Sequence, residues 1–271
     1  MKIGFFDSGL GGLMIQQQAA KMMPAYDMIY LGDTLHVPYG GRSPEAIYSY
    51  TTNAVKTLFE EDCALVIVAC NTASAQALRK LQQDWLPSQA PSRRVLGVIV
   101  PTLEAAIEAN HTHIGVIATE ATVRSKVYPY ELSKLNPNLK ITAKACPLLV
   151  PMIENGGRKW IKPILDEYLA PMIDAGIESL ILGCTHYPVL KAELEEALQE
   201  TGVTLISQDA IIPEKLADYL SRHPEIEERL SSNGTQTYFV SDLTPSYEEA
   251  AKAICGNALP LEKITLKHSG V

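Results

Sequence analysis

The chain has 271 residues, of which 46% are hydrophobic and 20% charged, as in ordinary globular proteins. Its 23 Lys and Arg against 31 Asp and Glu give a net charge of −8 (23 − 31), which argues against nucleic acid or an anionic membrane as a partner. The five cysteines form no C-x-x-C motif, so neither a zinc ribbon nor a disulfide scaffold is expected. We expect one large or two small domains with free thiols, in a reducing, cytoplasmic compartment.

Targeting and membrane segments are not expected. Residues 1–7 lack a charged segment followed by an apolar one, which is the pattern of a signal peptide. The longest apolar run, residues 64–70, is far shorter than the roughly 18 residues of a membrane span.

Short apolar segments alternate with helical patterns along the whole chain. Strands are predicted at 2–7, 28–31, 65–70, 95–100, 114–118, 141–145, 180–184, 204–207 and 238–240. Helices are predicted at 13–23, 44–61, 73–83, 102–108, 121–135, 159–175, 189–200 and 213–223. Most of the strands are continuous in Ile, Val and Leu, as in strands buried on both faces. The alternation therefore predicts α/β layers around mostly parallel sheets.

Two pairs of segments resemble each other at nearly the same spacing. IGFFDS at 3–8 resembles IGVIAT at 114–119, an offset of 111, and LVIVACNT at 65–72 resembles SLILGCTH at 179–186, an offset of 114. This echo predicts two pseudo-symmetric α/β domains. Both echoed cysteines then follow a buried strand, at the edge of the sheet where α/β proteins bind ligands. We therefore expect an interdomain active-site cleft with a thiol on each side.

The thiols of Cys70 and Cys184 each precede polar residues and a predicted helix. A helix N-terminus favours an anion, so we expect a lowered thiol pKa and a site that accepts a carboxylate. Asn71, Thr72 and Thr185 add neutral donors suited to a small carboxylate. The alternative is that both cysteines are simply buried apolar side chains.

His186 follows Cys184 by two residues and is placed to tune that thiol or to hydrogen-bond a ligand. A zinc site is not expected here, because no second pair of ligands accompanies it. No comparable run of polar residues follows Cys63, Cys146 or Cys255, and we expect these three cysteines to be ordinary buried residues.

A glycine-rich turn at residues 7–12 follows the first strand. It is not the dinucleotide motif G-x-G-x-x-G, because Met14 stands at its last position. We expect Ser8 and backbone N–H groups near a small anion, or else a tight strand-to-helix turn. Asp7 ends a buried strand and needs a partner. The glycines and proline of residues 32–41 predict a loop, which either closes over the cleft or is a surface turn.

A cleft with thiols on opposite sides suits proton transfer at opposite faces of one carbon. One thiolate removes a proton and the other thiol delivers one to the far face, which inverts the stereocentre. The α-proton of an amino acid is weakly acidic, so fixed donors to the carboxylate must stabilise the carbanion. No lysine stands in an obvious pyridoxal-phosphate setting, which favours a cofactor-free reaction.

The motifs together resemble the glutamate racemase family. Its pattern is seen in IGFFDSGLGG (3–12), YLGD (30–33), VPYG (37–40), ACNTASA (69–75), GVIVPT (97–102), IGVIATEAT (114–122) and LGCTHYP (182–188). The resemblance covers nearly the whole chain. It implies a cofactor-independent, metal-free isomerase that interconverts L- and D-glutamate and supplies D-glutamate for peptidoglycan.

The resemblance also implies roles for particular residues. Cys70 would act on D-glutamate with Asp7 beside it, and Cys184 on L-glutamate with His186 beside it and Glu154 behind. The implied substrate contacts are Asp7, Ser8, Tyr39, Gly40, Asn71, Thr72, Thr119, Thr185 and His186. The family fold implies domains at 1–96 plus 208–271 and at 97–207, and a homodimer. The sequence departs from the usual pattern at Met14 and His36, neither of which is expected in the catalytic core.

Three other functions remain open. The first is a two-thiol racemase for aspartate or a hydantoin. The second is a non-catalytic amino-acid-binding module, which would need the cleft but neither thiol. The third is a thiol nucleophile that forms a covalent adduct.

Overall fold

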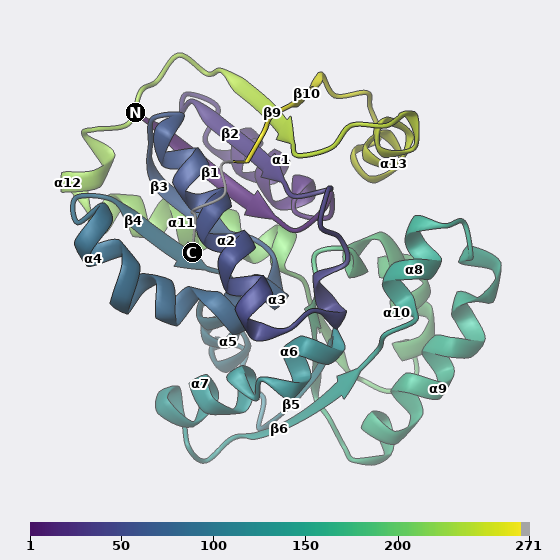
Figure 1. Cartoon of the computed structure of the whole chain (residues 1–271). Helices are drawn as coiled ribbons and strands as arrows, with labels where there is room; N and C mark the ends of the chain where they lie inside the picture. The colour runs from purple at the N-terminus through teal and green to yellow at the C-terminus, as the bar shows by residue number, and fades with distance from the viewer. Residues whose placement is uncertain (267–271) are drawn as a thin grey trace.

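The computed structural model describes residues 1–266 and contains two parallel β-sheets, each flanked by helices (Figure 1). The larger sheet has the strand order β10-β9-β2-β1-β3-β4 and the smaller one β6-β5-β7-β8. Every neighbouring pair of strands is parallel. The predicted fold class, two α/β units with parallel sheets, is confirmed.

The strands begin and end within two residues of the predicted positions, except that β4 ends three residues early and β10 matches no predicted strand. The larger sheet contains β1 (Lys2–Asp7), β2 (Met28–Gly32), β3 (Cys63–Val68), β4 (Arg94–Gly97), β9 (Gln236–Val240) and β10 (Leu261–Lys263). The smaller sheet contains β5 (His113–Ala118), β6 (Lys140–Ala145), β7 (Ser179–Gly183) and β8 (Thr204–Ile206).

The internal sequence echo corresponds to a structural repeat. The order β2-β1-β3-β4 in the larger sheet matches β6-β5-β7-β8 in the smaller one. The register also matches, because Ile3 pairs with Leu65 and the echoed Ile114 pairs with the echoed Ser179. Strands β9 and β10 extend the larger sheet beyond β2, outside the repeat.

Helices cover both faces of the larger sheet. One face packs against α1 (Leu13–Met22), α11 (Gln208–Arg222) and α13 (Pro245–Cys255). The other packs against α2 (Pro44–Glu60) and a continuous helical run formed by α3 (Asn71–Ala73), η2 (Ser74–Leu78), η3 (Leu81–Trp85) and α4 (Leu86–Gln89). The short α12 (Pro224–Glu227) follows α11.

The smaller sheet is covered in the same way. One face packs against α5 (Ile99–Glu108) and α7 (Val127–Leu135), and the other against α9 (Ile161–Asp174) and α10 (Lys191–Leu198). The remaining short elements are η1 (Tyr39–Gly41), α6 (Glu120–Arg124), α8 (Leu149–Glu154), η4 (Arg158–Trp160) and η5 (Tyr187–Leu190). In Figure 1, α8, α9 and α10 lie together on one side of the smaller sheet.

Several predicted boundaries are wrong. The helix predicted at 73–83 continues through α4 to Gln89, and α13 matches no predicted helix. The strand predicted at 95–100 ends at Gly97, and α5 begins at Ile99. The helix predicted at 121–135 is two helices, because Lys126 between them has a left-handed backbone (φ 56°) that a continuous helix does not allow. Helix α11 begins at Gln208, five residues before the predicted start.

The chain passes from the larger sheet to the smaller one after β4 and returns between β8 and α11. These are the places where domain boundaries at 96/97 and 207/208 are predicted, and the division into those two domains stays a prediction. None of the helices described within residues 1–266 is long and apolar enough to cross a membrane.

Candidate active site

A cavity of about 420 Å³ opens at the carboxyl ends of strands from both sheets. The predicted site residues that line it are Ser8, Tyr39, Gly40, Cys70, Asn71, Thr72, Thr119, Glu154, Cys184, Thr185 and His186. Asp7 is the exception, because it lies behind this lining. Residues far apart in the sequence thus meet at one site, while the role of each stays a prediction.

The thiol of Cys70 lies at the start of α3, where it caps the helix. Its sulfur accepts a hydrogen bond from the N–H of Ala73 at 3.5 Å and donates to the hydroxyl of Ser8 at 3.3 Å. Burial and, after it, the neighbouring Asp7 carboxylate raise the pKa of Cys70 to about 12, although the contacts with Ser8 and Ala73 lower it. The predicted lowering of the Cys70 pKa is therefore wrong, because burial and a nearby anion outweigh the helix N-terminus.

Asp7 links the two halves of the molecule. It is fully buried, and its two carboxylate oxygens accept hydrogen bonds from the Gly9 N–H at 3.0 Å and the Thr185 hydroxyl at 3.1 Å. The partner that a buried carboxylate requires is thus present on both sides. Gly9 donates its N–H to Asp7, and its carbonyl accepts a hydrogen bond from the Tyr30 hydroxyl at 2.8 Å. The backbone of Gly9 therefore stabilises the turn.

Gly11 allows the two halves to approach closely. A Cβ atom there would lie 2.6 Å from Oγ1 of Thr185 and 2.9 Å from the backbone nitrogen of His186. Only glycine fits against this backbone. The glycine-rich turn therefore brings together the half of the molecule that carries Cys70 and the half that carries Cys184.

The Cys184 side carries an imidazole in place of a carboxylate. The sulfur of Cys184 lies 3.9 Å from Nδ1 of His186. Nε2 of His186 forms an ion pair with Oε1 of Glu154 at 3.0 Å. Burial lowers the pKa of His186, but the contacts with Cys184 and Glu154 outweigh it and hold the pKa well above its ordinary value. These contacts therefore favour the protonated, cationic form of His186.

Two expectations about the cysteines need correction. The helical segment after Cys184, η5, begins only at Tyr187, so this thiol does not cap a helix as Cys70 does. Cys255 was expected to be buried and is only partly so, whereas Cys146 is buried as expected and also lines the cavity, where burial raises its pKa to about 12.

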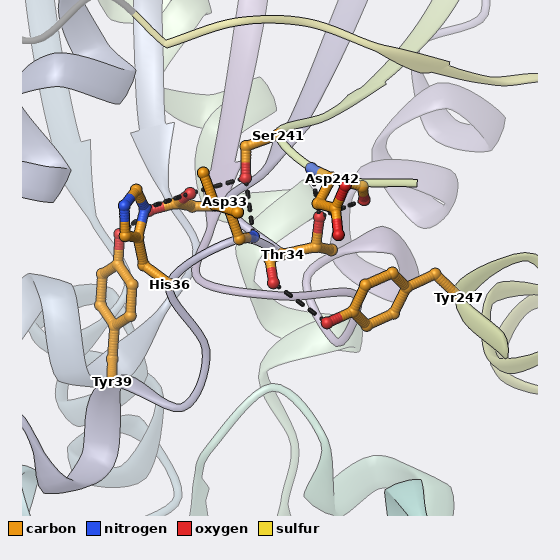
Figure 2. A network of polar contacts seen from close by, with 8 residues as sticks. Asp33, Thr34, His36, Tyr39, Ser241, Asp242 and Tyr247 are labelled. Atoms are coloured by element: carbon orange, nitrogen blue, oxygen red, sulfur yellow. Dashed lines mark hydrogen bonds and ion pairs between the residues drawn. The ribbon is translucent and has the colours of Figure 1, made fainter. Parts of the chain in front are cut away.

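Tyr39 and Gly40 are held at the cavity by a polar network around Asp33 (Figure 2). The buried carboxylate of Asp33 accepts hydrogen bonds from Tyr39 at 2.6 Å and Ser241 at 2.7 Å, and contacts Nδ1 of His36 at 2.9 Å. Burial and Asp33 hold the pKa of Tyr39 well above its ordinary value, so its hydroxyl keeps its proton.

The same network joins the segment after β2 to the carboxyl end of β9 and to α13. Thr34 donates to the carbonyl of Asp242 at 2.5 Å, and Tyr247 donates to the carbonyl of Thr34 at 3.0 Å (Figure 2). Residues 37–41 therefore line the cavity and residues 33–36 anchor them, so the segment is more than a surface turn. Sequence reasoning missed Asp33 and Ser241, although Asp33 follows a buried strand much as Asp7 ends one.

A contact between two hydroxyl groups also joins the two halves at the wall of the cavity. Thr72, at the start of α3, lies 2.9 Å from Thr119, which caps α6 by accepting from the N–H of Thr122 at 3.3 Å. Asn71 is bound to Gln208 and Tyr128, two residues that sequence reasoning also missed.

Size alone does not identify the site. A cavity of about 500 Å³ lies between η2, α5 and α11, and neither thiol lines it. Across residues 1–266, no group of three or more His, Cys, Asp and Glu side chains is arranged to hold a metal ion.

The fold and the cavity together define a class of protein. Two thiols at equivalent strand ends, one beside a carboxylate and one beside an imidazole, are an arrangement typical of enzymes that use acid–base chemistry on a small substrate. Comparison with known proteins narrows the class. The model of the Asp/Glu/Hydantoin racemase family matches residues 13–212, and the chain belongs to this family.

Relatives named glutamate racemase are similar in sequence to most of this chain. The glutamate racemase of Geobacter metallireducens is 38% identical over 260 residues, which cover 95% of this chain and 93% of that protein. The glutamate racemase of Dinoroseobacter shibae is 39% identical over 239 residues, covering 83% and 86%.

Solved structures of glutamate racemases also superpose on this chain. RacE1 glutamate racemase from Bacillus anthracis superposes with a TM-score of 0.88 at 32% identity, covering 98% of this chain and 97% of that one. Glutamate racemase from Francisella tularensis, solved with D-glutamate, gives 0.86 at 31% identity with the same coverage. The aspartate racemase of Picrophilus torridus shares the fold, with a TM-score of 0.58 at 17% identity over 82% of this chain and 95% of that one.

Proposed function

We propose that this protein is a glutamate racemase that interconverts L- and D-glutamate by two-base proton transfer at Cα, without a cofactor. The observation that carries this proposal is the presence of Cys70 and Cys184 in one cavity, at equivalent strand ends of the two halves. Family membership and the names of relatives at 37–39% identity support glutamate as the substrate.

The two thiols exchange roles in the two directions of the reaction. For L-glutamate, the thiolate of Cys184 removes the α-proton and the thiol of Cys70 delivers its proton to the opposite face, giving D-glutamate, the Cys184 thiol and the Cys70 thiolate. The surroundings fit this start, because cationic His186 lies beside Cys184 and anionic Asp7 keeps the proton on Cys70. The reverse reaction begins from the opposite protonation state.

Neutral donors are proposed to hold the two carboxylates of the substrate. In the part of the chain that the structure describes, no lysine or arginine lines the cavity. The available groups are Ser8, Asn71, Thr72, Thr119, Thr185 and the segment Tyr39–Gly40, together with the protonated His186. In a chain with a net charge of −8, such local donors must attract the anion. Glu154 is proposed to hold His186 in its protonated form.

The cellular role follows from the same proposal. We propose that the enzyme acts in the cytoplasm as a homodimer and supplies D-glutamate for peptidoglycan. Light scattering on the purified chain tests the dimer, and a single species of 29.6 kDa would contradict it.

The decisive experiment is incubation of the purified protein with L-glutamate in heavy water, with no cofactor added. We expect D-glutamate that carries deuterium at Cα, and no such product when Cys70 or Cys184 is replaced by serine. Turnover of aspartate but not glutamate would instead indicate an aspartate racemase. Dependence on added pyridoxal phosphate, or a covalent thiol adduct seen by mass spectrometry, would contradict the two-base mechanism.

A further inference from the structure

Gln208, the first residue of α11, lies where the chain returns from the smaller sheet to the larger one. Its side chain is 1% exposed, and its partners Asn71, Thr102 and Tyr128 are at most 3% exposed. Thr102 is on α5 and Tyr128 on α7, both of which pack on the smaller sheet, whereas Asn71 begins α3 and lines the cavity. The amide of Gln208 therefore connects the two halves directly behind a wall of the active site.

The amides of Asn71 and Gln208 exchange two hydrogen bonds. Nδ2 of Asn71 donates to Oε1 of Gln208 at 2.7 Å, and Nε2 of Gln208 donates to Oδ1 of Asn71 at 3.0 Å. Oδ1 of Asn71 also accepts from the Tyr128 hydroxyl at 2.8 Å. Burial holds the pKa of Tyr128 well above its ordinary value, so this hydroxyl keeps the proton that it donates.

The backbone carbonyl of Val98 determines which group donates in each of these hydrogen bonds. The hydroxyl of Thr102 donates to the carbonyl of Val98 at 2.6 Å, and a carbonyl only accepts. Because the only hydroxyl hydrogen of Thr102 is donated to Val98, the Thr102 oxygen can only accept a hydrogen bond from Gln208. Nε2 of Gln208 donates to it at 3.2 Å. With Nε2 on that side, Oε1 of Gln208 faces Asn71 and requires a donor, so Asn71 must present Nδ2 there.

We propose that Gln208 is a positioning residue that fixes the amide of Asn71 with its nitrogen, and not its oxygen, available to the substrate. An amide nitrogen carries two hydrogens, and Asn71 gives one of them to Gln208. The other is free to bind a substrate carboxylate, whereas the flipped amide would turn an oxygen towards an anion. The proposal rests on the proposed racemase function and names a residue outside the predicted site.

The test compares KM and kcat in variants that keep the size of the side chain. Gln208→Met removes both hydrogen-bonding groups but keeps the length of the chain. We expect KM for both enantiomers of glutamate to rise about tenfold, with kcat changed by less than about threefold. The two enantiomers have equal free energy, so kcat/KM must stay equal in the two directions, which checks each data set.

A double-mutant cycle separates positioning from general loss of structure. In an Asn71→Ala background, Gln208→Met should raise KM no further, because the group that it orients is gone. Effects that multiply in the double variant would overturn the proposal. Gln16→Met is the matched control, since Gln16 is buried and pairs its amide with Gln236 at 2.6 Å outside the cavity. This control should lower the melting temperature and leave KM unchanged.

Thr102 provides a second, milder pair of variants that keeps the test valid if Gln208→Met does not fold. Thr102→Val removes the hydroxyl that sets the direction, and we expect KM to rise about threefold. Thr102→Ser keeps the hydroxyl and should retain the wild-type KM. A folded Gln208→Met or Thr102→Val variant with the wild-type KM overturns the proposed role of Gln208 and leaves the proposed racemase function unaffected. A wild-type protein that does not racemise glutamate overturns the proposed function before any variant is compared.

Discussion

The Cys70 side and the Cys184 side of the cavity occupy equivalent places in a structural repeat, yet opposite charges lie beside the two thiols. By the offset of 111, Asp7 corresponds to Ala118, and by the offset of 114, Thr72 corresponds to His186. The anion beside Cys70 and the cation beside Cys184 thus arise at positions where the two halves differ. The repeat places both thiols at one cavity, and departures from the repeat make their surroundings unlike.

This difference has a chemical consequence for a racemase. Two identical thiols would share one preferred protonation state, and neither direction of the reaction would find one base and one acid ready. In the proposed mechanism, Asp7 beside one thiol and His186 beside the other favour a start in which one thiol has a proton to give and the other can receive one. The predictions below test that asymmetry, from the largest effect to the smallest.

Removal of one thiol should separate the two sides most strongly. In Cys70→Ala and in Cys184→Ala, we expect inversion of glutamate to fall at least about 10³-fold. Cys70→Ala should still exchange the α-proton of L-glutamate with heavy water through Cys184, and Cys184→Ala should exchange that of D-glutamate through Cys70. Mass spectrometry after chiral separation measures both.

Cys255→Ala is the matched control, because this thiol lies on α13, away from the cavity, and inversion should stay at the wild-type rate. Equal exchange of both enantiomers by either single-thiol variant would show that the thiols are not assigned to opposite faces.

Much of the candidate site was predictable from the sequence, because most of its residues stand next to strand ends. Ser8, Cys70, Thr119 and Cys184 each lie within two residues of a strand that apolar runs identify, and parallel strands bring their carboxyl ends to one edge. The resemblance added Glu154, which no local pattern marks.

The supporting contacts were not predictable in this way. Ser241 is 208 residues from Asp33, and Gln208 is 137 residues from Asn71, so no local spacing reports either pair. The pKa of Cys70 was predicted in the wrong direction for a related reason. A helix N-terminus is visible in the sequence, whereas the depth of burial and the approach of Asp7 depend on the tertiary fold.

Asp7→Asn should weaken the asymmetry on the Cys70 side. The change removes the charge that, after burial, raises the pKa of Cys70 most, so the pKa should fall and the thiolate become more abundant. We expect alkylation of Cys70 by iodoacetamide at pH 8, measured in a Cys184→Ala background, to become several-fold faster. In the two-thiol enzyme, racemisation should fall about 10- to 100-fold.

Asp27→Asn is the control for this change, since Asp27 is a buried carboxylate that accepts from Thr235 and Asn233 at the opposite end of β2. It should lower stability without changing the alkylation rate. Slower alkylation in Asp7→Asn would mean that Asp7 does not act on Cys70 through its charge.

The smallest expected effect concerns the ion pair on the Cys184 side, measured as stability against pH. The folded-state pKa of His186 is held above its unfolded value near 6.5, partly by Glu154. The folded state therefore binds this proton more tightly than the unfolded state. The resulting stability is fully present below pH 6.5 and is lost as the pH rises through the folded pKa.

Glu154→Gln should accordingly lower the free energy of unfolding more at pH 6 than at pH 10. The difference should be at most about 1 kcal/mol, because the Glu154 side chain is 38% exposed and solvent screens the pair. Asp218→Asn breaks an exposed pair with Arg222 at 2.7 Å, and since arginine does not titrate in this range, its effect should be the same at both pH values. Urea unfolding at the two pH values measures all three proteins. If Glu154→Gln loses equal stability at both, Glu154 does not hold the proton on His186, and the cation beside Cys184 must depend on the thiol itself.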